Sequence, residues 1–325
     1  MTEVAPATAF VTEHFAEVEA AAERIRPYIR RTPALTTDLD PGLRLKPECF
    51  QVAGSFKPRG AFNAVLSLVA RERPRGVIAV SSGNHAQAVA LAARTVGIPA
   101  LILIPEDANP AKVAATRALG AEVIQEGITF ANREQRLQEV MAERGFTLVH
   151  PFDNWDVIHG QGSAALELLA DDPELAVIAT PVGGGGLLSG TAITAAAQGQ
   201  SIKVVGVEPA AADDAYQTWK SGTIQSLPES PKTLADGVRT TAIGTRNFEV
   251  MFGNRLVSEI VTVSEDEIAA AVRVAWTRLR LALEPTGVLP LAAFIAGKLP
   301  PGPTGLILSG GNANLQTVAT LLATP

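Results

Sequence analysis

The chain has 325 residues, of which 47% are hydrophobic and 18% are charged, and its formal net charge is −6. This length allows a large core and two domains, and the negative charge argues against nucleic acid or an anionic membrane as a partner. No apolar stretch approaches the roughly 20 residues of a membrane span. Residues 1–10 lack the Arg-flanked apolar run of a signal peptide, and the single cysteine, Cys49, excludes an intrachain disulfide and a cysteine-based zinc site. A reducing cytoplasm is therefore expected.

The first predicted elements lead to a lysine in an unusual position. Residues 10–31 are spaced as an amphipathic helix, and residues 43–50 read as a strand. In the following stretch Lys57 stands just before Pro58, at the start of a helix predicted for residues 56–70. The positive end of the helix dipole there favours the neutral amine, the form that attacks an aldehyde. A solvated surface lysine is the alternative that this pattern leaves open.

Strands and helices then alternate along the rest of the chain. The predicted strands lie at residues 76–80, 100–104, 121–125, 148–150, 177–180, 204–207 and 306–308. The predicted helices lie at residues 84–96, 110–119, 129–144, 156–169, 187–197 and 264–283. This rhythm indicates parallel sheets with right-handed crossovers, which bind ligands beyond the carboxyl ends of their strands. Residues 222–246 are the least regular part and are predicted to form a long ordered loop.

Three loops that follow predicted strands suit a polar or anionic ligand. Residues 81–85, Ser-Ser-Gly-Asn-His, precede a helix and offer N–H groups and hydroxyls to a carboxylate, although a plain helix cap is the alternative. Residues 183–186 are four glycines that can wrap a phosphate, although a flexible turn is the alternative. Their surroundings fit neither a Gly-Lys-Ser/Thr nucleotide loop nor the dinucleotide fingerprint. In the third loop, residues 309–312, Ser309 offers a hydroxyl to a ring nitrogen or to the last helix.

An acidic segment follows the strand predicted at residues 204–207. Glu208 and Asp214, together with a main-chain oxygen near Ala212, would supply hard oxygen ligands. Such ligands suit Mg²⁺, Ca²⁺ or Mn²⁺ better than zinc. A solvated acidic helix start is the alternative.

Taken together, these pieces resemble the fold-type II pyridoxal-phosphate (PLP) enzymes, in the branch of serine/threonine dehydratases and serine racemases. The matching stretches span nearly the whole chain in family order: residues 54–60, 81–87, 181–187, 234–238, 284–287 and 309–312. The resemblance implies an α/β fold of two doubly wound parallel-sheet domains, tryptophan synthase β-like, with the active site in the cleft between them. Residues 1–72 and 150–325 would form the large PLP-binding domain, and residues 73–149 the small substrate-binding domain.

The resemblance also implies a role for each candidate residue. Lys57 would hold the aldehyde of pyridoxal 5'-phosphate as an imine and carry the proton of the substrate Cα, with Phe56 packed on the ring. Asn84 would bind the ring hydroxyl, and Ser309 would face the ring nitrogen. The phosphate would be held by Gly183, Gly184, Gly185, Gly186 and Leu187. The substrate would be bound by Ser81, Ser82, Gly83, Asn84, His85 and Arg133.

The implied reaction is β-elimination from small hydroxy amino acids such as L-threonine and L-serine, which gives a 2-oxo acid and ammonia. A serine rather than a carboxylate at the ring nitrogen makes the ring a weaker electron sink, which suits elimination over transamination. Ser82 would be able to move a second proton on the opposite cofactor face, so serine racemase and 3-hydroxyaspartate dehydratase are alternatives. A non-catalytic PLP-binding module is an alternative of another class. The resemblance further implies a divalent cation at Glu208, Ala212 and Asp214, and a cytoplasmic homodimer.

Overall fold

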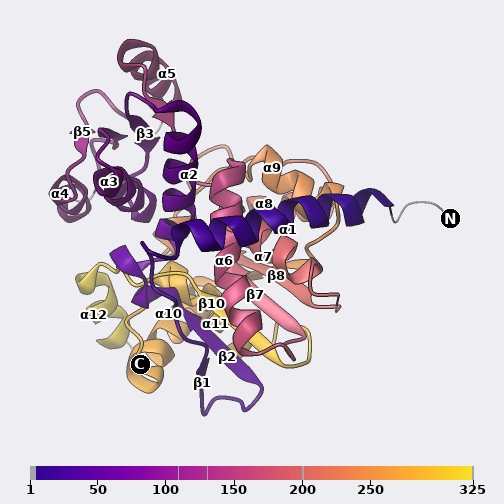
Figure 1. The fold of residues 1–325 in the computed structure, drawn as a ribbon. Helices are drawn as coiled ribbons and strands as arrows, with labels where there is room; N and C mark the ends of the chain where they lie inside the picture. Colours follow the sequence, from indigo (N-terminus) through magenta and orange to yellow (C-terminus); the bar gives the residue numbers. More distant parts are fainter. Residues whose placement is uncertain (1–4, 109, 130, 200, 324–325) are drawn as a thin grey trace.

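The computed structural model describes residues 5–323 except 109, 130 and 200, and contains two sheets (Figure 1). The smaller sheet has four parallel strands in the order β5-β4-β3-β6. Its strands are β3 (Val77–Val80), β4 (Ala100–Leu103), β5 (Glu122–Ile124) and β6 (Thr147–Leu148). Three helices follow β3, β4 and β5 in turn, namely α3 (Asn84–Val96), α4 (Pro110–Ala118) and α5 (Arg133–Arg144). We call this sheet with its helices the four-stranded unit.

The larger sheet has six strands in the order β1-β2-β10-β7-β8-β9. They are β1 (Leu35–Thr36), β2 (Leu43–Pro47), β7 (Val177–Pro181), β8 (Lys203–Pro209), β9 (Glu259–Val263) and β10 (Thr304–Leu308). Among the described strand pairs of this sheet, only the edge pair β1–β2 is antiparallel. Every residue of the central strands β7 and β10 is buried, as expected for strands covered on both faces. We call this sheet with its helices the six-stranded unit.

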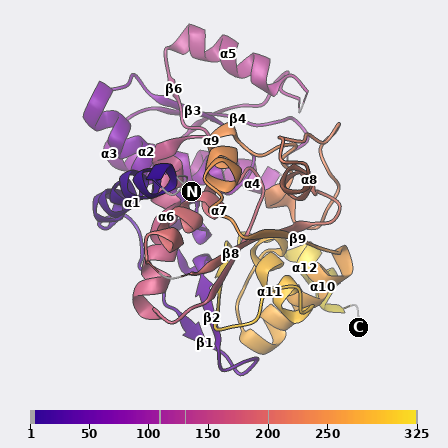
Figure 2. The same cartoon turned by 90° about the vertical axis from the view of Figure 1, so that its right-hand side faces the viewer.

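Helices cover the six-stranded sheet on both faces (Figure 2). One face carries α1 (Ala5–Ile25), α6 (Trp155–Asp171) and α7 (Gly186–Ala196), and the other carries α10 (Glu265–Val274), α11 (Leu289–Ile295) and α12 (Leu315–Ala323). Two shorter helices, α8 (Asp214–Ser221) and α9 (Thr245–Phe248), complete the unit. Among the described residues, no helix is both long and apolar enough to cross a bilayer.

Helix α2 (Lys57–Glu72) contacts α3 of the four-stranded unit and α6 of the six-stranded unit. Its first turn lies very close to α6, because a Cβ added at Gly160 would stand 2.4 Å from the carbonyl oxygen of Arg59. The start of α2, and with it Lys57, is therefore held by close backbone packing. Since α2 touches both units, the domain boundaries after residues 72 and 149 stay a prediction.

The alternation of strands and helices is confirmed, and most elements lie within a few residues of their expected bounds. The helix expected over residues 10–31 instead spans Ala5–Ile25, and the chain then turns through a hydrogen bond from Tyr28 N–H to the Ile25 carbonyl. The strand expected over residues 43–50 ends at Pro47 and is followed by two 3-10 turns, η1 (Glu48–Phe50) and η2 (Val52–Gly54). Residues 222–244 form a loop that contains the short η3 (Asp236–Val238), as expected for an irregular segment, whereas the last two residues of the predicted loop begin α9.

Two expected helices differ at one end. The helix predicted from residue 129 begins at Arg133, because Thr129 and Asn132 bond each other's backbone N–H through their side chains. Such local bonds compete with a helix. The helix predicted over residues 264–283 begins with a capping box at Ser264 but changes to a π-helical turn, η5 (Ala275–Leu279), and ends where Arg280 takes a left-handed conformation.

Candidate functional site

Three candidate loops follow neighbouring strands of the six-stranded sheet. The segment of residues 48–57, which we call the lysine loop, follows β2. Residues 309–312 follow β10, and the four glycines follow β7. These three strands lie side by side in that order. Backbone bonds join the first two loops, from Phe56 N–H to the Ser309 carbonyl at 3.0 Å and from Gly311 N–H to the Gly54 carbonyl at 2.9 Å. The sheet thus brings together, at its carboxyl edge, segments that are distant in the sequence.

Lys57 is the first residue of α2, and its side chain is half-buried. Its Nζ donates to the Pro151 carbonyl at 3.0 Å and lies 5.0 Å from the centroid of the Phe56 ring. Burial lowers the pKa of Lys57 to about 8. The helix dipole was the predicted cause of a neutral amine, whereas removal from water is the cause that the structure provides. At pH 7 roughly a tenth of the amine is therefore neutral, far more than for a lysine with the ordinary pKa of 10.5.

The glycine loop lies against the segment that holds the lysine. A Cβ added at Gly184 would stand 2.2 Å from the ring of Phe152, the residue after the carbonyl that binds Lys57. Gly185 adopts φ of 98°, a left-handed conformation that glycine tolerates. Helix α7 begins at Gly186, and no side chain in the described chain caps it. The uncapped N–H groups at the start of α7 and the side-chain-free backbone of the glycines suit a phosphate, which favours an anion site over a plain flexible turn.

Two further predicted residues line the same edge. Phe56 packs against the apolar cluster that includes Leu187, the residue after the glycine quartet. Ser309 is buried directly after β10, and its carbonyl accepts the Phe56 N–H. The structure therefore brings Phe56, Ser309 and the glycine loop together with Lys57, while their roles toward a cofactor stay predictions.

The loop before α3 approaches this edge from the four-stranded unit. Ser81 Oγ accepts the Gly83 N–H at 3.2 Å, and Ser82 is half-buried. The alternative of a plain cap by Ser82 or Asn84 is wrong, because the N-cap residue is Gly83 and no described side chain caps the helix. The first N–H groups of α3 are thus left for a ligand such as a carboxylate.

Asn84 reaches from this helix to the six-stranded unit. Its Nδ2 donates to Glu284 Oε1 at 2.7 Å, and its Oδ1 accepts from Asn312 Nδ2 at 2.8 Å. Glu284 is 3% exposed, and burial, followed by the negative charge of Asp236, raises its pKa to about 7. The stretch at residues 284–287 carried part of the resemblance, but no role for Glu284 was predicted.

Two neutral histidines lie near Lys57. His85 Nε2 donates to the Val149 carbonyl at 2.8 Å, which leaves Nδ1 buried without a partner among the described residues. Burial, and next the charge of Lys57, lowers the pKa of His85 to about 3. His150 Nδ1 accepts the Asp153 N–H at 2.8 Å, and burial lowers its pKa also. The sequence reasoning missed His150, whose only signal was its position as the last residue of a predicted strand.

Arg133 is the first residue of α5, with its guanidinium Nε 3.8 Å from the Glu134 carboxylate. Burial lowers its pKa. No described contact ties it to the other candidate residues, so a role in substrate binding stays a prediction.

The predicted cation ligands lie at the carboxyl end of β8. Glu208 and Asp214 are each 1% exposed, and Ala212 is buried between them in the sequence. Glu208 accepts the N–H groups of Ala215 and Tyr216, whereas Asp214 Oδ2 has no hydrogen-bond partner in the described chain. Burial raises the pKa of Glu208 to about 9, with the charge of Asp214 as the second cause, and burial raises that of Asp214 to about 7.

This acid pair differs from the predicted alternative of a solvated helix start. An orphaned buried carboxylate oxygen and an all-oxygen ligand set fit a hard divalent cation. The described residues hold no cluster of three or more His, Cys, Asp or Glu side chains suited to a metal. Main-chain oxygens and water would therefore have to complete the coordination.

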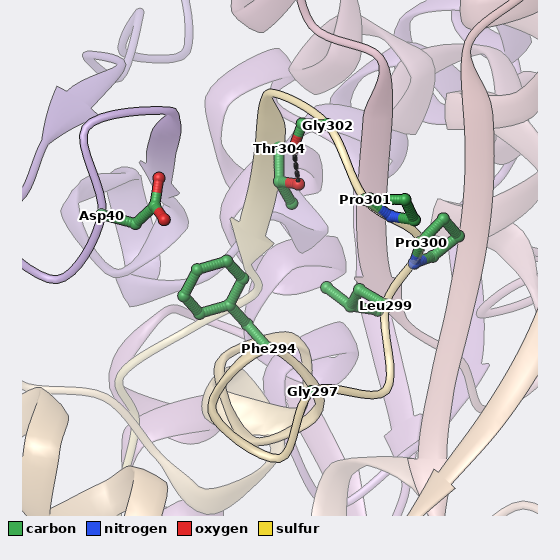
Figure 3. Close-up of a pocket in the computed structure, with 8 residues that line it drawn as sticks. All are labelled: Asp40, Phe294, Gly297, Leu299, Pro300, Pro301, Gly302 and Thr304. Atoms are coloured by element: carbon green, nitrogen blue, oxygen red, sulfur yellow. Dashed lines mark hydrogen bonds between the residues drawn. The ribbon is translucent and has the colours of Figure 1, made fainter.

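A surface cavity of about 230 Å³ lies elsewhere, near Asp40 and Phe294 (Figure 3). Thr304, the first residue of β10, lines it and donates its hydroxyl to the Gly302 carbonyl at 2.8 Å. The cavity therefore opens at the amino end of β10, opposite to Ser309. Its lining has one carboxylate and is otherwise largely apolar, so it adds nothing to the candidate site.

Comparison with known proteins identifies relatives along nearly the whole chain. The model of the family described as pyridoxal-phosphate dependent enzyme matches residues 25–310. The L-threo-3-hydroxyaspartate ammonia-lyase of Saccharomyces cerevisiae is 42% identical over 316 residues, which cover 95% of this chain and 96% of the relative. The serine racemase of Arabidopsis thaliana is 40% identical over 313 residues, which cover 93% of each chain.

Solved structures show the same arrangement. The crystal structure of a threonine deaminase from T.th. aligns with a TM-score of 0.86 and 46% identity, over 92% of this chain and 98% of that chain. The structure of maize serine racemase aligns with a TM-score of 0.88 and 38% identity, over 94% and 95% of the two chains. The α/β fold with two mainly parallel sheets, predicted from the resemblance, is confirmed.

Proposed function

We propose that this chain, which belongs to the pyridoxal-phosphate dependent enzymes, is an ammonia-lyase that acts on small hydroxy amino acids such as L-threonine and L-serine. The observation that carries the proposal is the position of Lys57. Its amine is held at the Pro151 carbonyl, and the next residue, Phe152, packs under the glycine loop. The family, and relatives described as ammonia-lyases and a threonine deaminase, support this reaction class.

When bound, pyridoxal phosphate supplies an aldehyde for covalent attachment and a ring that withdraws electrons from the substrate Cα. Lys57 would attach to that aldehyde, and the uncapped start of α7 with the glycine loop would bind the phosphate. Phe56 would pack on the ring, Asn84 would donate to its hydroxyl oxygen, and Ser309 would face its nitrogen. The cofactor fits these residues, because the structure offers a half-buried amine of lowered pKa and a glycine-lined helix N-terminus that lies against the segment holding that amine.

Different side chains and main-chain groups would bind the substrate and transfer its protons. The N–H groups at the start of α3, with Ser81 and Ser82, would hold the substrate carboxylate, and His85 and Arg133 would complete the substrate contacts. The neutral Lys57 amine would accept the proton of Cα. The Cβ–O bond would then break as the hydroxyl takes up the proton that Lys57 removed from Cα and leaves as water. Hydrolysis of the dehydrated amino acid would yield a 2-oxo acid and ammonia. Burial lowers the pKa values of His85 and His150 below the ordinary imidazole value, so both are weaker bases than Lys57.

A racemase or 3-hydroxyaspartate dehydratase is the second candidate, and Ser82 favours it. Racemisation needs a proton carrier on each face of the substrate Cα, and a hydroxyl at position 82 would serve opposite Lys57. Relatives named serine racemase and L-threo-3-hydroxyaspartate ammonia-lyase support this alternative. We expect Ser82→Ala to abolish racemisation while it spares threonine elimination. Equal loss of both activities would mean that Ser82 only binds the carboxylate.

Glu208, Ala212 and Asp214 are the proposed ligands of a divalent cation, Mg²⁺, Ca²⁺ or Mn²⁺. The unpartnered Asp214 oxygen and the raised pKa values of both carboxyls support it. The homodimer, the cytoplasmic location and the two domains stay predictions. Light scattering on the purified protein would test the homodimer, because a monomer mass would exclude it.

The decisive experiment compares cofactor attachment in Lys57→Ala with the exposed-lysine control Lys203→Ala. Wild type and control are expected to show the visible absorbance of a lysine-bound cofactor, and Lys57→Ala is expected to lose it. A wild-type protein that stays colourless with added pyridoxal phosphate would overturn the proposal. A coloured protein that forms no oxo acid from serine, threonine or 3-hydroxyaspartate, in either stereochemistry, and racemises none of them would be a non-catalytic binding module.

A further inference from the structure

A chain of side-chain hydrogen bonds links four segments around the candidate site. Asn312 Nδ2 donates to the Ala53 carbonyl at 2.7 Å and to Asn84 Oδ1 at 2.8 Å. Asn84 Nδ2 donates in turn to Glu284 Oε1 at 2.7 Å. Ala53 belongs to the lysine loop, and Asn84 is the first residue of α3 in the four-stranded unit. Glu284 follows η5 and Asn312 follows β10, both in the six-stranded unit.

The two ends of this chain determine the orientation of both amides. Both end groups, the Ala53 carbonyl and the Glu284 carboxyl, accept hydrogen bonds. If the Asn84 amide alone were turned over, its oxygen would face the Glu284 oxygen and its nitrogen would face the Asn312 donor. If both amides were turned over, the Asn312 oxygen would face the Ala53 carbonyl. Only the observed orientation avoids paired acceptors or paired donors.

Glu284 is well placed to act as a fixed end. It is 3% exposed, and its own N–H donates to the Gly310 carbonyl at 3.1 Å. A Cβ added at Gly310 would stand 2.7 Å from Glu284 Oε1, so the carboxyl has little room to move. Burial raises its pKa to about 7, and both the neutral and the ionised carboxyl can accept the Asn84 N–H.

We propose that Glu284, together with Asn312, is a positioning residue that fixes the Asn84 amide with its one remaining N–H free for the cofactor. An amide nitrogen has two N–H groups, and Glu284 occupies one of them. Asn312 already uses one of the two lone pairs of the Asn84 oxygen, so we expect the site to present the remaining N–H as a donor. This inference rests on the proposed role of Asn84 toward the ring hydroxyl. It predicts that the ring oxygen is bound as an acceptor.

The test is a double-mutant cycle on the affinity of the cofactor-free full-length protein for pyridoxal phosphate. Glu284→Ala and Asn84→Ala are each expected to weaken binding on the order of tenfold, the usual size for a lost buried hydrogen bond. If Glu284 acts through Asn84, the double variant binds no more than about twofold more weakly than Asn84→Ala alone. Glu284→Gln, whose amide oxygen still accepts, should restore most of the affinity.

Effects that multiply in the double variant, or a Glu284→Gln protein as weak as Glu284→Ala, would overturn the inference. Glu23→Ala on the exposed surface of α1 is the matched control and should bind as wild type does. If melting curves show that Glu284→Ala does not fold, Asn312→Ala enters the same cycle from the other side of the amide. If wild type binds no pyridoxal phosphate, the proposed function itself fails. If binding through Lys57 holds but the effects multiply, only the positioning role fails.

Discussion

Two groups of buried charges in the six-stranded unit follow opposite rules. The first, which we call the Arg59 cluster, consists of Lys46, Glu48, Arg59 and Glu167. Arg59 bonds Glu48 at 2.7 Å and Glu167 at 2.8 Å, and Lys46 bonds Glu167 at 2.6 Å. The two positive and two negative side chains neutralise one another.

The second group is the acid pair of Glu208 and Asp214. It has two carboxyls and no cation within the described residues to balance them, and one Asp214 oxygen has no partner. Lys57 is similar, because burial lowers its pKa and its Nζ bonds a main-chain carbonyl, that of Pro151, rather than a carboxylate. We infer from the contrast that a buried charge which only supports the fold is neutralised inside the protein. A charge left unbalanced marks a place that an outside ligand is expected to complete.

Breaking the Arg59 cluster should give the largest effect on stability. Arg59→Met would leave the carboxylates of Glu48 and Glu167 buried without their main partner, at a cost of about 3–5 kcal/mol in the free energy of unfolding. Arg71→Met, on the same helix, is the matched control, because Arg71 pairs with Asp156 at the surface. That exposed pair should be worth about 0–1 kcal/mol. Chemical denaturation measures both, and equal losses would remove the distinction between the cluster and a surface pair.

The stability that the acid pair gives to the fold should depend on pH and on added divalent cations. The folded pKa values of about 9 for Glu208 and about 7 for Asp214 lie above the ordinary values of 4.5 and 3.8. Between these limits the folded state holds protons that the unfolded state releases, so the cation-free protein should lose stability as pH rises. We expect a loss of about 1–3 kcal/mol between pH 6 and pH 8. Added Mg²⁺, Ca²⁺ or Mn²⁺ should restore it, more at pH 8 than at pH 6.

Glu208→Gln sharpens this prediction, since glutamine can still accept the N–H groups at the start of α8. The variant should be more stable than wild type at pH 8 without a cation, and it should gain little from added cation. Thermal melting after treatment with a chelator gives the comparison. A wild-type melting temperature that ignores both chelator and cation would remove the cation site.

The sequence was sufficient for features that are local in the chain. The glycine quartet, the lysine before Pro58 and the Ser-Ser-Gly-Asn-His segment each sit in a short pattern, and each lies where the alternation of strands and helices predicts a loop. The order β2-β10-β7, which brings these loops together, is a matter of long-range pairing. No periodicity in the sequence contains it, so only the resemblance pointed to a shared site.

The residues that sequence reasoning missed act through distant partners. Glu284 bonds Asn84 across 200 positions in the chain, and Arg59 bonds Glu167 across 108. Each partner alone reads as an ordinary surface charge, because burial and pairing appear only after the sheets form. The cause of the lowered Lys57 pKa was misjudged for the same reason. The helix dipole can be read from the sequence, whereas enclosure by the Pro151 segment cannot.

The smallest effect should come from Lys57, whose single unbalanced charge is only half-buried. Lys57→Met should stabilise the cofactor-free protein at pH 7 by on the order of 1 kcal/mol, as expected when an unfavourable group is kept for function. The folded pKa of about 8 lies below the ordinary 10.5, so the folded state binds fewer protons than the unfolded state between these values. Wild-type stability therefore rises with pH across that window, and the advantage of Lys57→Met should be full below pH 8 and shrink toward pH 10.5. Denaturation at pH 7 and pH 10, with Lys203→Met as an exposed control, measures this difference, and a gain that grows with pH would contradict it.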